Sequence, residues 1–191
     1  ARQASIHAGI PVTKPAYVVN QVCGSGLRSI VSGFQSIKLD AEMIVVSGGQ
    51  ENMSRAPHAL FYRENKKLDD SKLIDTMLND GLIDSFNHYH MGVTAENVAE
   101  KFKISRDEQD NFALNSQKKT QEALSKNKFK DEIIKLEIKT DKKVLVFDKD
   151  EHPRGNLILD DLKKLKTVFK ENGTVTPGNS SGINDGAAAT V

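Results

Sequence analysis

The residue with the clearest chemical potential in this sequence is Cys23, the only cysteine in the chain. It stands between a run of β-branched residues and a turn containing Gly24 and Gly26, which opens a stretch with helical spacing. The start of a helix favours a thiolate, because the unpaired N–H groups of the first turn carry a partial positive charge. The two glycines also allow a ligand to approach the backbone, and a backbone N–H in such a turn can stabilise an oxyanion.

The helix end alone is too weak to activate this thiol. It stabilises a thiolate by about 0.3–1 kcal/mol, whereas each tenfold gain in ionisation takes about 1.4 kcal/mol. A nucleophilic role for Cys23 therefore requires a nearby base. The alternative is that Cys23 is a small buried hydrophobic side chain, as free cysteines often are. Position alone does not separate the two interpretations, and the flanking glycines favour the nucleophile.

Histidine is the most common candidate for such a base. The chain has five of them, namely His7, His58, His88, His90 and His152. For any one taken alone, a surface or structural role is the simpler interpretation. His88 and His90 form the densest cluster, but no cysteine or carboxylate stands beside them at metal-ligand spacing. The sequence therefore predicts no metal site, and a place in the lining of a pocket suits this cluster better.

A second candidate ligand segment is the polar stretch 174–186. It contains three glycines, two asparagines and four hydroxyl side chains. Such a composition suits a turn that presents backbone N–H and hydroxyl groups to a ligand. Because all these residues are also common turn formers, an ordinary surface loop is the alternative.

Residues 16–50 are expected to form the β-α-β unit that positions Cys23. Residues 17–22 are typical of a strand, and residues 43–46 form a short apolar run of the kind found in parallel strands, ended by Gly48 and Gly49. Between them, apolar residues recur at helical spacing and predict one buried stripe. These residues are Leu27, Ile30, Val31, Phe34 and Ile37.

Residues 51–176 are richer in charge and predict a mixed α and β segment. Thr94 is expected to cap a helix that runs to Phe102, and Ser105 with Glu108 forms a capping box for the next helix, towards Leu124. Residues 134–139 alternate like a half-buried strand, with 144–147 as a possible partner. Four lysine pairs (66–67, 118–119, 142–143 and 163–164) are expected on a solvated face, with attraction of a polyanionic ligand as the alternative.

Composition excludes several classes of protein. The chain of 191 residues has a net charge of +1, which argues against a nucleic-acid partner. No apolar run approaches the roughly 20 residues of a membrane span, and no signal peptide is evident. A single cysteine rules out an internal disulfide and predicts a reducing compartment, such as a bacterial cytoplasm, or a mitochondrial matrix if the source is eukaryotic.

The two ends of the chain also carry a prediction. Residues 1–8 have the pattern of the last turns of a helix, stopped by Gly9 and Pro11. The apolar run 186–191 ends where a buried strand or helix should be under way. Because natural domain ends are usually polar and exposed, we expect this chain to be a piece of a longer one.

Four blocks of this sequence together resemble the thiolase family. Residues 20–28 (NQVCGSGLR) resemble its active-site cysteine block, and residues 48–54 (GGQENMS) the block that follows the next core strand. Residues 89–97 (YHMGVTAEN) resemble the pantetheine block of its loop domain, and 174–186 its coenzyme A block. Their order and spacing agree across essentially the whole chain. Ketoacyl synthases share glycine-rich cysteine turns but lack the long insert that carries His90, Met91 and Gly92.

The resemblance implies an α/β fold, a partial thiolase-like α/β-α-β-α layered domain with an inserted α+β loop domain. Residues 1–51 would be part of the N-terminal core with the nucleophile, 52–176 the inserted loop domain that binds coenzyme A, and 177–191 the return to the core. Thiolases are dimers or dimers of dimers, so a homodimer or homotetramer is implied for the full-length protein. Residues 53–74 fall where tetrameric members place an assembly loop.

The resemblance also implies an activity. In thiolases the cysteine here numbered Cys23 accepts an acyl group from coenzyme A, and a deprotonated second acetyl-CoA condenses with it; thiolysis is the reverse reaction. The backbone N–H of Cys23 would also serve an oxyanion hole. Coenzyme A thioesters would be substrates, with no permanently bound cofactor, and neither nucleic acid nor membrane would be a partner.

The same match implies a set of substrate contacts. His90 and Met91 would line the acyl-pantetheine tunnel, and Ser181 with Gly182 would contact the pantetheine. Leu82 and Arg154 fall where the insert holds the adenine end, on a weaker local motif. Pro177 replaces a small residue often found at its position, a departure that affects that contact.

The block containing His90, Met91 and Gly92 is typical of thiolases that act on acetoacetyl-CoA, which predicts an acetyl-CoA acetyltransferase. A degradative 3-ketoacyl-CoA thiolase is the alternative, and a non-catalytic coenzyme A-binding module is a further one. Three family blocks are absent from this chain, Asn-Glu-Ala-Phe, Gly-His-Pro and Cys-x-Gly. The last two supply the activating histidine and the acid/base cysteine. The base for Cys23 would therefore not be among the five histidines, and this chain alone should not turn over.

Overall fold

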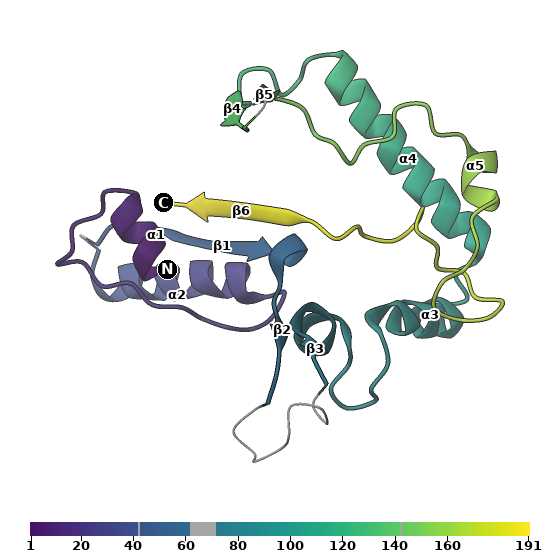
Figure 1. The fold of residues 1–191 in the computed structure, drawn as a ribbon, viewed down its shortest axis with the longest axis horizontal. Helices are drawn as coiled ribbons and strands as arrows, with labels where there is room; N and C mark the ends of the chain where they lie inside the picture. Colours follow the sequence, from purple (N-terminus) through teal and green to yellow (C-terminus); the bar gives the residue numbers. More distant parts are fainter. Residues whose placement is uncertain (42, 62–71, 142) are drawn as a thin grey trace. The chain divides into compact units, whose positions relative to one another are not determined.

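A computed structural model describes residues 1–41, 43–61, 72–141 and 143–191 (Figure 1). The chain folds as two compact units, the first formed by residues 1–83 with 183–191 and the second by residues 84–182. Each unit is described by itself. These units follow from contacts, whereas the division into 1–51, 52–176 and 177–191 follows the resemblance and stays a prediction. Part of the expected assembly loop, residues 62–71, lies outside the described residues.

The first unit contains short helices and two small sheets. The helix that starts the chain, α1 (Arg2–His7), ends as the sequence predicts, since Gly9 follows it with φ at +82°. The remaining elements are α2 (Ser25–Leu39), β1 (Ser47–Asn52), the 3₁₀ turn η1 (Met53–Arg55), β2 (His58–Ala59), β3 (Ile74–Asp75), the π-helical turn η3 (Leu78–Leu82) and β6 (Asp185–Thr190). β2 and β3 pair with each other in an antiparallel ladder.

The main sheet of this unit pairs segments far apart in the sequence. β1 and β6 are antiparallel, with Ser47 opposite Thr190 and Asn52 opposite Asp185 (Figure 1). Just past the end of this ladder, the Ser54 backbone N–H and hydroxyl donate to the Asp185 carboxylate at 3.0 and 2.5 Å. These hydrogen bonds lower the pKa of Asp185. The pairing brings the end of the chain back to the region that follows α2.

The expected strands of this unit are wrong in position. The glycine pair lies inside β1 rather than after it, and residues 43–46 are not in a strand. β1 forms at 47–52 because that is where β6 supplies hydrogen-bonding partners, and a Cβ on Gly48 would lie 2.3 Å from the carbonyl oxygen of Ala188. Residues 17–20 are also outside any strand, and residues 21 and 23 form only an isolated bridge. Because β1 pairs antiparallel with β6, the expected parallel pairing of a β-α-β unit is not observed among the described residues.

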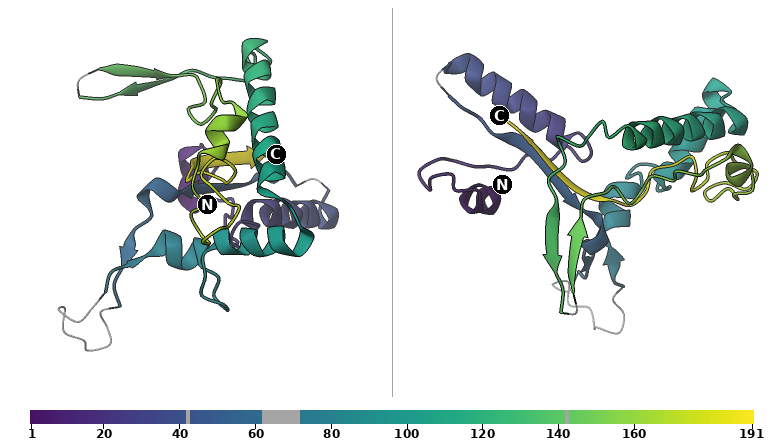
Figure 2. Two further views of the ribbon diagram at one scale, coloured as in Figure 1. Left: turned by 90° about the vertical axis from the view of Figure 1, so that its right-hand side faces the viewer. Right: turned by 90° about the horizontal axis from the view of Figure 1, so that it is seen from above.

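α2 runs alongside β1 and contacts it through small residues (Figure 2). Gly33 is buried there, and a Cβ at that position would lie 2.6 Å from the hydroxyl oxygen of Ser47. The Ser29 hydroxyl donates to the Gly48 carbonyl at 2.9 Å, and that of Ser47 to the Ser29 carbonyl at 3.1 Å. The small-residue face, not the apolar one, therefore packs on the sheet.

The apolar stripe predicted to be buried on α2 is exposed. Leu27 and Phe34 expose 69% and 59% of their surface, and Ile30, Val31 and Ile37 are exposed as well. The prediction of the helix is correct, but the prediction of its burial is wrong. The reason is that the described part of this unit offers the helix only the two-stranded sheet of β1 and β6, and the small residues of α2 pack against it.

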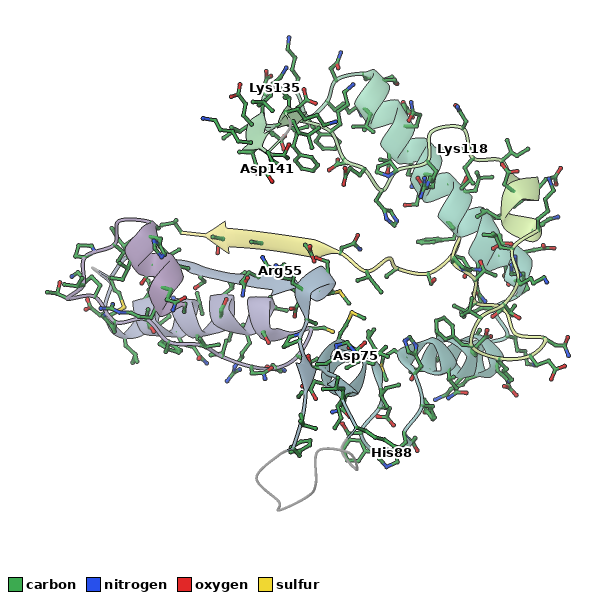
Figure 3. The ribbon with its side chains drawn as sticks, viewed as in Figure 1. Arg55, Asp75, His88, Lys118, Lys135 and Asp141 are labelled. Atoms are coloured by element: carbon green, nitrogen blue, oxygen red, sulfur yellow. The ribbon has the colours of Figure 1, made fainter. Side chains whose placement is uncertain are left out.

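The second unit is built on two helices, α3 (Met91–Phe102) and α4 (Arg106–Ser125). α4 begins with the expected capping box, in which the Ser105 hydroxyl accepts from the Glu108 N–H and the Glu108 carboxylate accepts from the Ser105 N–H at 2.7 Å. β4 (Leu136–Lys139) and β5 (Val144–Phe147) form the expected antiparallel pair, but every residue of both strands is exposed, so the expected half-burial is wrong. A short helix, α5 (Leu159–Lys163), packs on α4. Lys118 lies on the exposed surface of α4 (Figure 3), and Lys119 beside it is exposed as well. Lys163 at the end of α5 and Lys164, its C-cap, are also exposed, whereas the pair 66–67 and Lys142 lie outside the described residues.

The small core lies in this second unit. The buried hydrophobic side chains of the described residues are Ala99, Leu114, Leu162 and Val175. They come from α3, α4, α5 and the loop that precedes β6. Buried polar side chains lie among them, and they hold the segment predicted to bind a ligand. No helix in the described part of the chain is both long and apolar enough to cross a membrane.

Candidate active site

Cys23 is exposed and lies just before α2, whose N-cap is Gly24. The thiol is thus placed at the start of a 15-residue helix, as the sequence predicts. The turn is closed by the Gly24 and Ser25 N–H groups, which donate to the carbonyls of Gln21 and Val22 at 2.9 and 3.1 Å. Among the described residues of this unit, no hydrophobic side chain is buried, which disfavours the alternative of a core cysteine.

The residue before Cys23 is held in a strained conformation. Val22 has φ at +47°, in the left-handed region that β-branched residues avoid. Two side chains hold it there. The Asn20 carboxamide accepts from the Val22 N–H at 3.0 Å, while the Ser25 hydroxyl accepts from the Gln21 N–H at 2.8 Å and donates to the Val22 carbonyl at 2.7 Å. Strain of this kind is typical of functional turns. Here it sets the direction in which the Cys23 side chain points from the backbone.

His90 is the N-cap of α3, so the prediction that Thr94 caps this helix is wrong. Its Nδ1 accepts from the Gly92 N–H at 2.9 Å, so an imidazole takes the place of the usual hydroxyl or carboxylate cap. In the neutral ring this bond places the proton on Nε2, which is left as a donor for a ligand. α3 therefore starts at Met91, four residues earlier than a cap at Thr94 would place it.

Phe169 fixes the plane of the same imidazole. The two rings stack with centroids 4.6 Å apart and planes inclined by 15°. A Cβ on Gly92 would lie 2.2 Å from a ring carbon of Phe169, so this position leaves room only for glycine. Both rings are half-buried. His90 is thus held from two sides, by its cap bond and by the aromatic face.

The loop before His90 is also tied down. The Asp84 carboxylate accepts from the backbone N–H and the side-chain amide of Asn87 at 2.7 and 2.6 Å, and these bonds lower the pKa of Asp84. The Asp84 N–H donates to the Tyr89 carbonyl at 2.8 Å. His88 is exposed in the left-handed region with φ at +57° (Figure 3). The two clustered histidines are therefore in different environments: the His90 ring is held by its cap bond and by the aromatic ring stacked on it, whereas His88 is exposed and its backbone N–H donates to the Asp84 carbonyl at 2.8 Å.

The other predicted contacts are distributed over both units. Met91 is the first residue of α3 and is 37% exposed. Leu82 ends the π-helical turn of the first unit and is half-buried. Arg154 is exposed, and its backbone N–H donates to the Gln117 side chain of α4 at 2.8 Å. Ser181 and Gly182 end the second unit and are exposed.

The loop that leads to Ser181 is anchored by a buried glutamate. Glu96 of α3 is 3% exposed and accepts the N–H groups of Thr174 and Val175, each at 2.8 Å, and the Thr174 hydroxyl, also at 2.8 Å. Burial raises the pKa of Glu96. The hydrogen bonds from Val175 and Thr174, together with the charge of Lys170, lower the pKa by more than burial raises it, so the net pKa is below the ordinary value.

A second buried carboxylate holds the far side of the same loop. Asp110 of α4 is fully buried and accepts from the Asn179 side-chain amide at 3.0 Å. It also pairs with Arg106 at 2.7 Å, and the Arg106 guanidinium donates to the carbonyls of Leu162 and Leu165 at 2.6 and 3.1 Å. Asn179 closes the loop on itself through the Thr176 N–H at 2.8 Å. Buried side-chain polar atoms of the described residues all have partners.

Sequence reasoning missed Phe169, Glu96 and Asp110. A signal for Glu96 was present, since it lies four residues after Gly92 and three before Ala99, on the face of α3 that is buried. Asp110 likewise lies one helical turn before the buried Leu114. Phe169 carries no comparable signal. In the described part of the chain, no three histidine, cysteine, aspartate or glutamate residues form a group that could hold a metal.

Comparison with known proteins identifies the family. The sequence model of the family described as "Thiolase, N-terminal domain" matches residues 1–191, the whole chain. The chain belongs to the thiolase family. The partial thiolase-like α/β fold inferred from the sequence blocks is thereby confirmed.

This thiolase chain is similar to curated proteins named acetyl-CoA acetyltransferase. It is 51% identical over 189 residues to the acetyl-CoA acetyltransferase of Paracoccus denitrificans, covering 99% of this chain and 48% of the relative. It is 50% identical over 189 residues to that of Rhizobium meliloti, with the same coverage of 99% and 48%. The chain thus spans about half the length of the curated relatives it matches.

Solved thiolase structures agree with the fold. The human mitochondrial 3-ketoacyl-CoA thiolase matches with a TM-score of 0.90 and 43% identity, over 99% of this chain and 48% of that one. A structure of human mitochondrial 3-ketoacyl-CoA thiolase in complex with CoA matches with a TM-score of 0.89 and 42% identity, over 99% and 47%. The acetyl-CoA acetyltransferase of Bacillus anthracis gives 0.89 and 40% identity, over 99% and 48%.

Proposed function

We propose that the protein containing this chain is an acetyl-CoA C-acetyltransferase, which condenses two acetyl-CoA to acetoacetyl-CoA and free coenzyme A, or runs the reverse thiolysis. The observation that supports this most is the placement of Cys23 at the start of α2 in a chain about half identical, over its whole length, to acetyl-CoA acetyltransferases. Coenzyme A thioesters are the substrates, and no permanently bound cofactor is needed.

In the first half-reaction the Cys23 sulfur attacks the thioester carbonyl of acetyl-CoA. A carbon–sulfur bond forms to Cys23, the bond to the coenzyme A sulfur breaks, and the departing thiolate takes up a proton. The turn supports this step in two ways: the start of α2 favours the anionic sulfur, and the Cys23 N–H can donate to the developing oxyanion. The strained Val22 conformation keeps both groups in a fixed direction.

In the second half-reaction the methyl group of another acetyl-CoA loses a proton and its carbon attacks the acetyl-cysteine. The new carbon–carbon bond forms as the bond to Cys23 sulfur breaks, which regenerates the nucleophile. We place the base that activates Cys23 outside this chain, together with the second acid/base group. The chain by itself is then expected to be inactive, and turnover belongs to the complete protein.

Coenzyme A recognition is assigned to the six residues named from the sequence blocks. His90 and Met91 line the acyl-pantetheine path, where the Nε2 proton of His90 is a suitable donor to a thioester oxygen. Ser181 and Gly182 contact the pantetheine. Leu82 and Arg154 receive the adenine end.

A degradative 3-ketoacyl-CoA thiolase is the second candidate, and the match to the human mitochondrial enzyme with a TM-score of 0.90 favours it. The two differ in acyl chain length, so the ratio of thiolysis rates on acetoacetyl-CoA and on a 3-ketoacyl-CoA of about ten carbons separates them. Comparable rates would remove the short-chain assignment. We further propose a homodimer or homotetramer in a reducing compartment, the bacterial cytoplasm or a mitochondrial matrix.

The nucleophile is tested with the complete protein and acetyl-CoA labelled in its acetyl group. The wild-type protein should retain the label on the tryptic peptide that contains Cys23, and Cys23→Ser should retain none. Label that still attaches to the serine variant at the wild-type level would show that another residue accepts the acetyl group. A non-catalytic coenzyme A-binding module would bind coenzyme A but acquire no label at all.

A further inference from the structure

We propose that Glu96 is a positioning residue for coenzyme A, which fixes the Ser181–Gly182 loop against the His90 end of α3. The inference rests on the proposed function, because it concerns the residues assigned there to the acyl-pantetheine. Glu96 itself touches none of the reacting atoms. Its contacts join the two parts of the second unit that carry these residues.

The first step is the geometry of its contacts. One carboxylate accepts three donors of the loop within 2.9 Å, the N–H groups of Thr174 and Val175 and the Thr174 hydroxyl. Gly173 makes this approach possible, since a Cβ there would lie 2.3 Å from the Glu96 carboxylate oxygen. Backbone N–H groups held by an ionised acceptor form hydrogen bonds about twice as strong as neutral ones. The loop is thus held by its main chain.

The second step is the position of Glu96 on its helix. Glu96 lies six residues after His90, the N-cap, on the same rigid helix. At 1.5 Å per residue, the start of the helix is less than about 10 Å away. An anchor at this point therefore fixes the distance between the His90 imidazole and the loop, on which the placement of a thioester between them depends.

The third step is the path from the anchor to the ligand contacts. After Val175 the chain makes a tight turn, in which Thr176 is fully buried and the Ser180 hydroxyl donates to the Thr176 carbonyl at 2.7 Å. Asn179 is held by Asp110 at 3.0 Å. Ser181 follows directly. Because this turn is held by hydrogen bonds, a displacement of Val175 also displaces Ser181.

The test uses the complete protein and two acetyl donors. Acetyl-CoA makes all the contacts assigned to the loop, whereas S-acetyl-N-acetylcysteamine lacks most of the pantetheine. We expect Glu96→Gln to raise the KM for acetyl-CoA about tenfold with kcat changed less than about twofold, the loss of roughly one charge-assisted hydrogen bond. The kcat/KM for the short donor should stay within about twofold. Glu100→Gln, which removes an exposed carboxylate one turn further along α3, should match the wild type for both donors.

A milder pair of variants covers the case in which Glu96→Gln does not fold. Thr174→Val removes the hydroxyl that donates to Glu96 and accepts from the Gln109 side-chain amide at 2.9 Å, and Thr174→Ser keeps both bonds. Gln109→Ala removes the second bond but not the first, and it should leave the KM for acetyl-CoA close to the wild-type value. The valine variant should raise the KM for acetyl-CoA about threefold and the serine variant should restore it, again with little change for the short donor.

Three results would overturn the inference. Equal losses for both donors would show a general effect on folding, and a fall in kcat at constant KM would place Glu96 in the chemistry. A Glu96→Gln variant that behaves as Glu100→Gln would show no role. A wild-type protein that neither binds coenzyme A nor acquires an acetyl group on Cys23 would instead refute the proposed function itself, so the two failures are distinct.

Discussion

The imidazole of His90 stacks on the ring of Phe169, with centroids 4.6 Å apart and planes inclined by 15°. The two residues are 79 positions apart in the sequence, and the contact joins the start of α3 to the segment that leads into the loop containing Ser181 and Gly182. The Phe169 ring holds one face of the imidazole, and the hydrogen bond to Nδ1 fixes its rotation. The Nε2 proton of His90 therefore points in one direction.

Phe169→Leu should therefore loosen His90 without removing it. The variant keeps a hydrophobic side chain but loses the flat ring, and we expect a stability loss of about 0.5–1.5 kcal/mol beyond that due to buried area. Acetyl-CoA should bind more weakly, by about three- to tenfold, as measured by titration calorimetry. Phe112→Leu is the control, because Phe112 on α4 is 80% exposed. Equal effects of both changes would contradict a role for the stack.

Gly92→Ala should be costly because of the same ring. The added methyl would lie 2.2 Å from a carbon of Phe169, and overpacking of this kind costs about 1–3 kcal/mol. Chemical denaturation should show this loss together with weaker coenzyme A binding. In Gly81→Ala the new Cβ meets nothing within 4 Å, so stability should change by less than about 1 kcal/mol. A Gly92→Ala protein as stable as the Gly81 variant would mean that the ring can move aside.

Ser25→Ala should slow the reactions of Cys23. The Ser25 hydroxyl bridges the Gln21 N–H and the Val22 carbonyl, and without it the strained φ of Val22 loses part of its support. The rate of Cys23 alkylation by iodoacetamide, with the yield of acetyl-enzyme, measures the effect, which we expect to be about three- to tenfold. Ser36→Ala removes a hydroxyl that donates only to the Ser32 carbonyl within α2, and it should leave both rates unchanged.

Arg106→Ala should destabilise the second unit strongly. It leaves the fully buried Asp110 without its ionic partner and frees two carbonyls beside α5. Breaking a buried pair from one side costs about 3–5 kcal/mol. Lys163→Ala removes an exposed pair with Asp107 at 3.8 Å and should cost less than about 1 kcal/mol. Urea denaturation of the two variants should differ clearly, and similar midpoints would refute the importance of the Arg106 pair.

Glu96 should make stability depend on pH in the acid range. Its pKa in the folded protein is lowered from 4.5, so the unfolded chain binds a proton first as pH falls. The stabilisation is therefore complete above a pH of about 4.5 and is lost as pH falls through the lower pKa of the folded state. The difference in unfolding free energy between wild type and Glu96→Gln should shrink over that interval.

Lowered pKa values at Asp84, Glu100, Glu108 and Asp185 act in the same direction, so the wild type alone is not diagnostic. Only the difference between the two proteins isolates Glu96. A constant difference from about pH 6 to about pH 3 would mean that the pKa of Glu96 is the same in the folded and the unfolded chain.

The features correctly predicted from the sequence are those with short-range causes. The capping box of Ser105 and Glu108, the helix end at Gly9 and the hairpin of β4 and β5 each depend on residues less than about 15 positions apart. The glycine turn and the helical spacing that follows it likewise placed Cys23 at the start of a helix. In each case the residues that determine the local structure belong to the same short segment that adopts it.

The features that sequence reasoning missed depend on distant partners. β1 forms at residues 47–52 because β6 pairs with it, and nothing near residue 47 signals that partner. Glu96 resembles any helical carboxylate until Thr174 and Val175 are placed against it. The apolar stripe of α2 was predicted to be buried because its apolar residues recur at helical spacing. That spacing shows only that the helix has an apolar face, not that the described residues cover it.

The pairing of β1 with β6 has a consequence for the order of events during synthesis. The first unit needs a strand from each end of the chain, whereas the second is one continuous segment. At about 5–20 residues per second, a ribosome takes on the order of ten seconds to pass from one strand to the other. All of the second unit leaves the ribosome in that interval, so it can fold before β6 is available to pair with β1. The sheet that α2 packs against is therefore completed later than the second unit can fold.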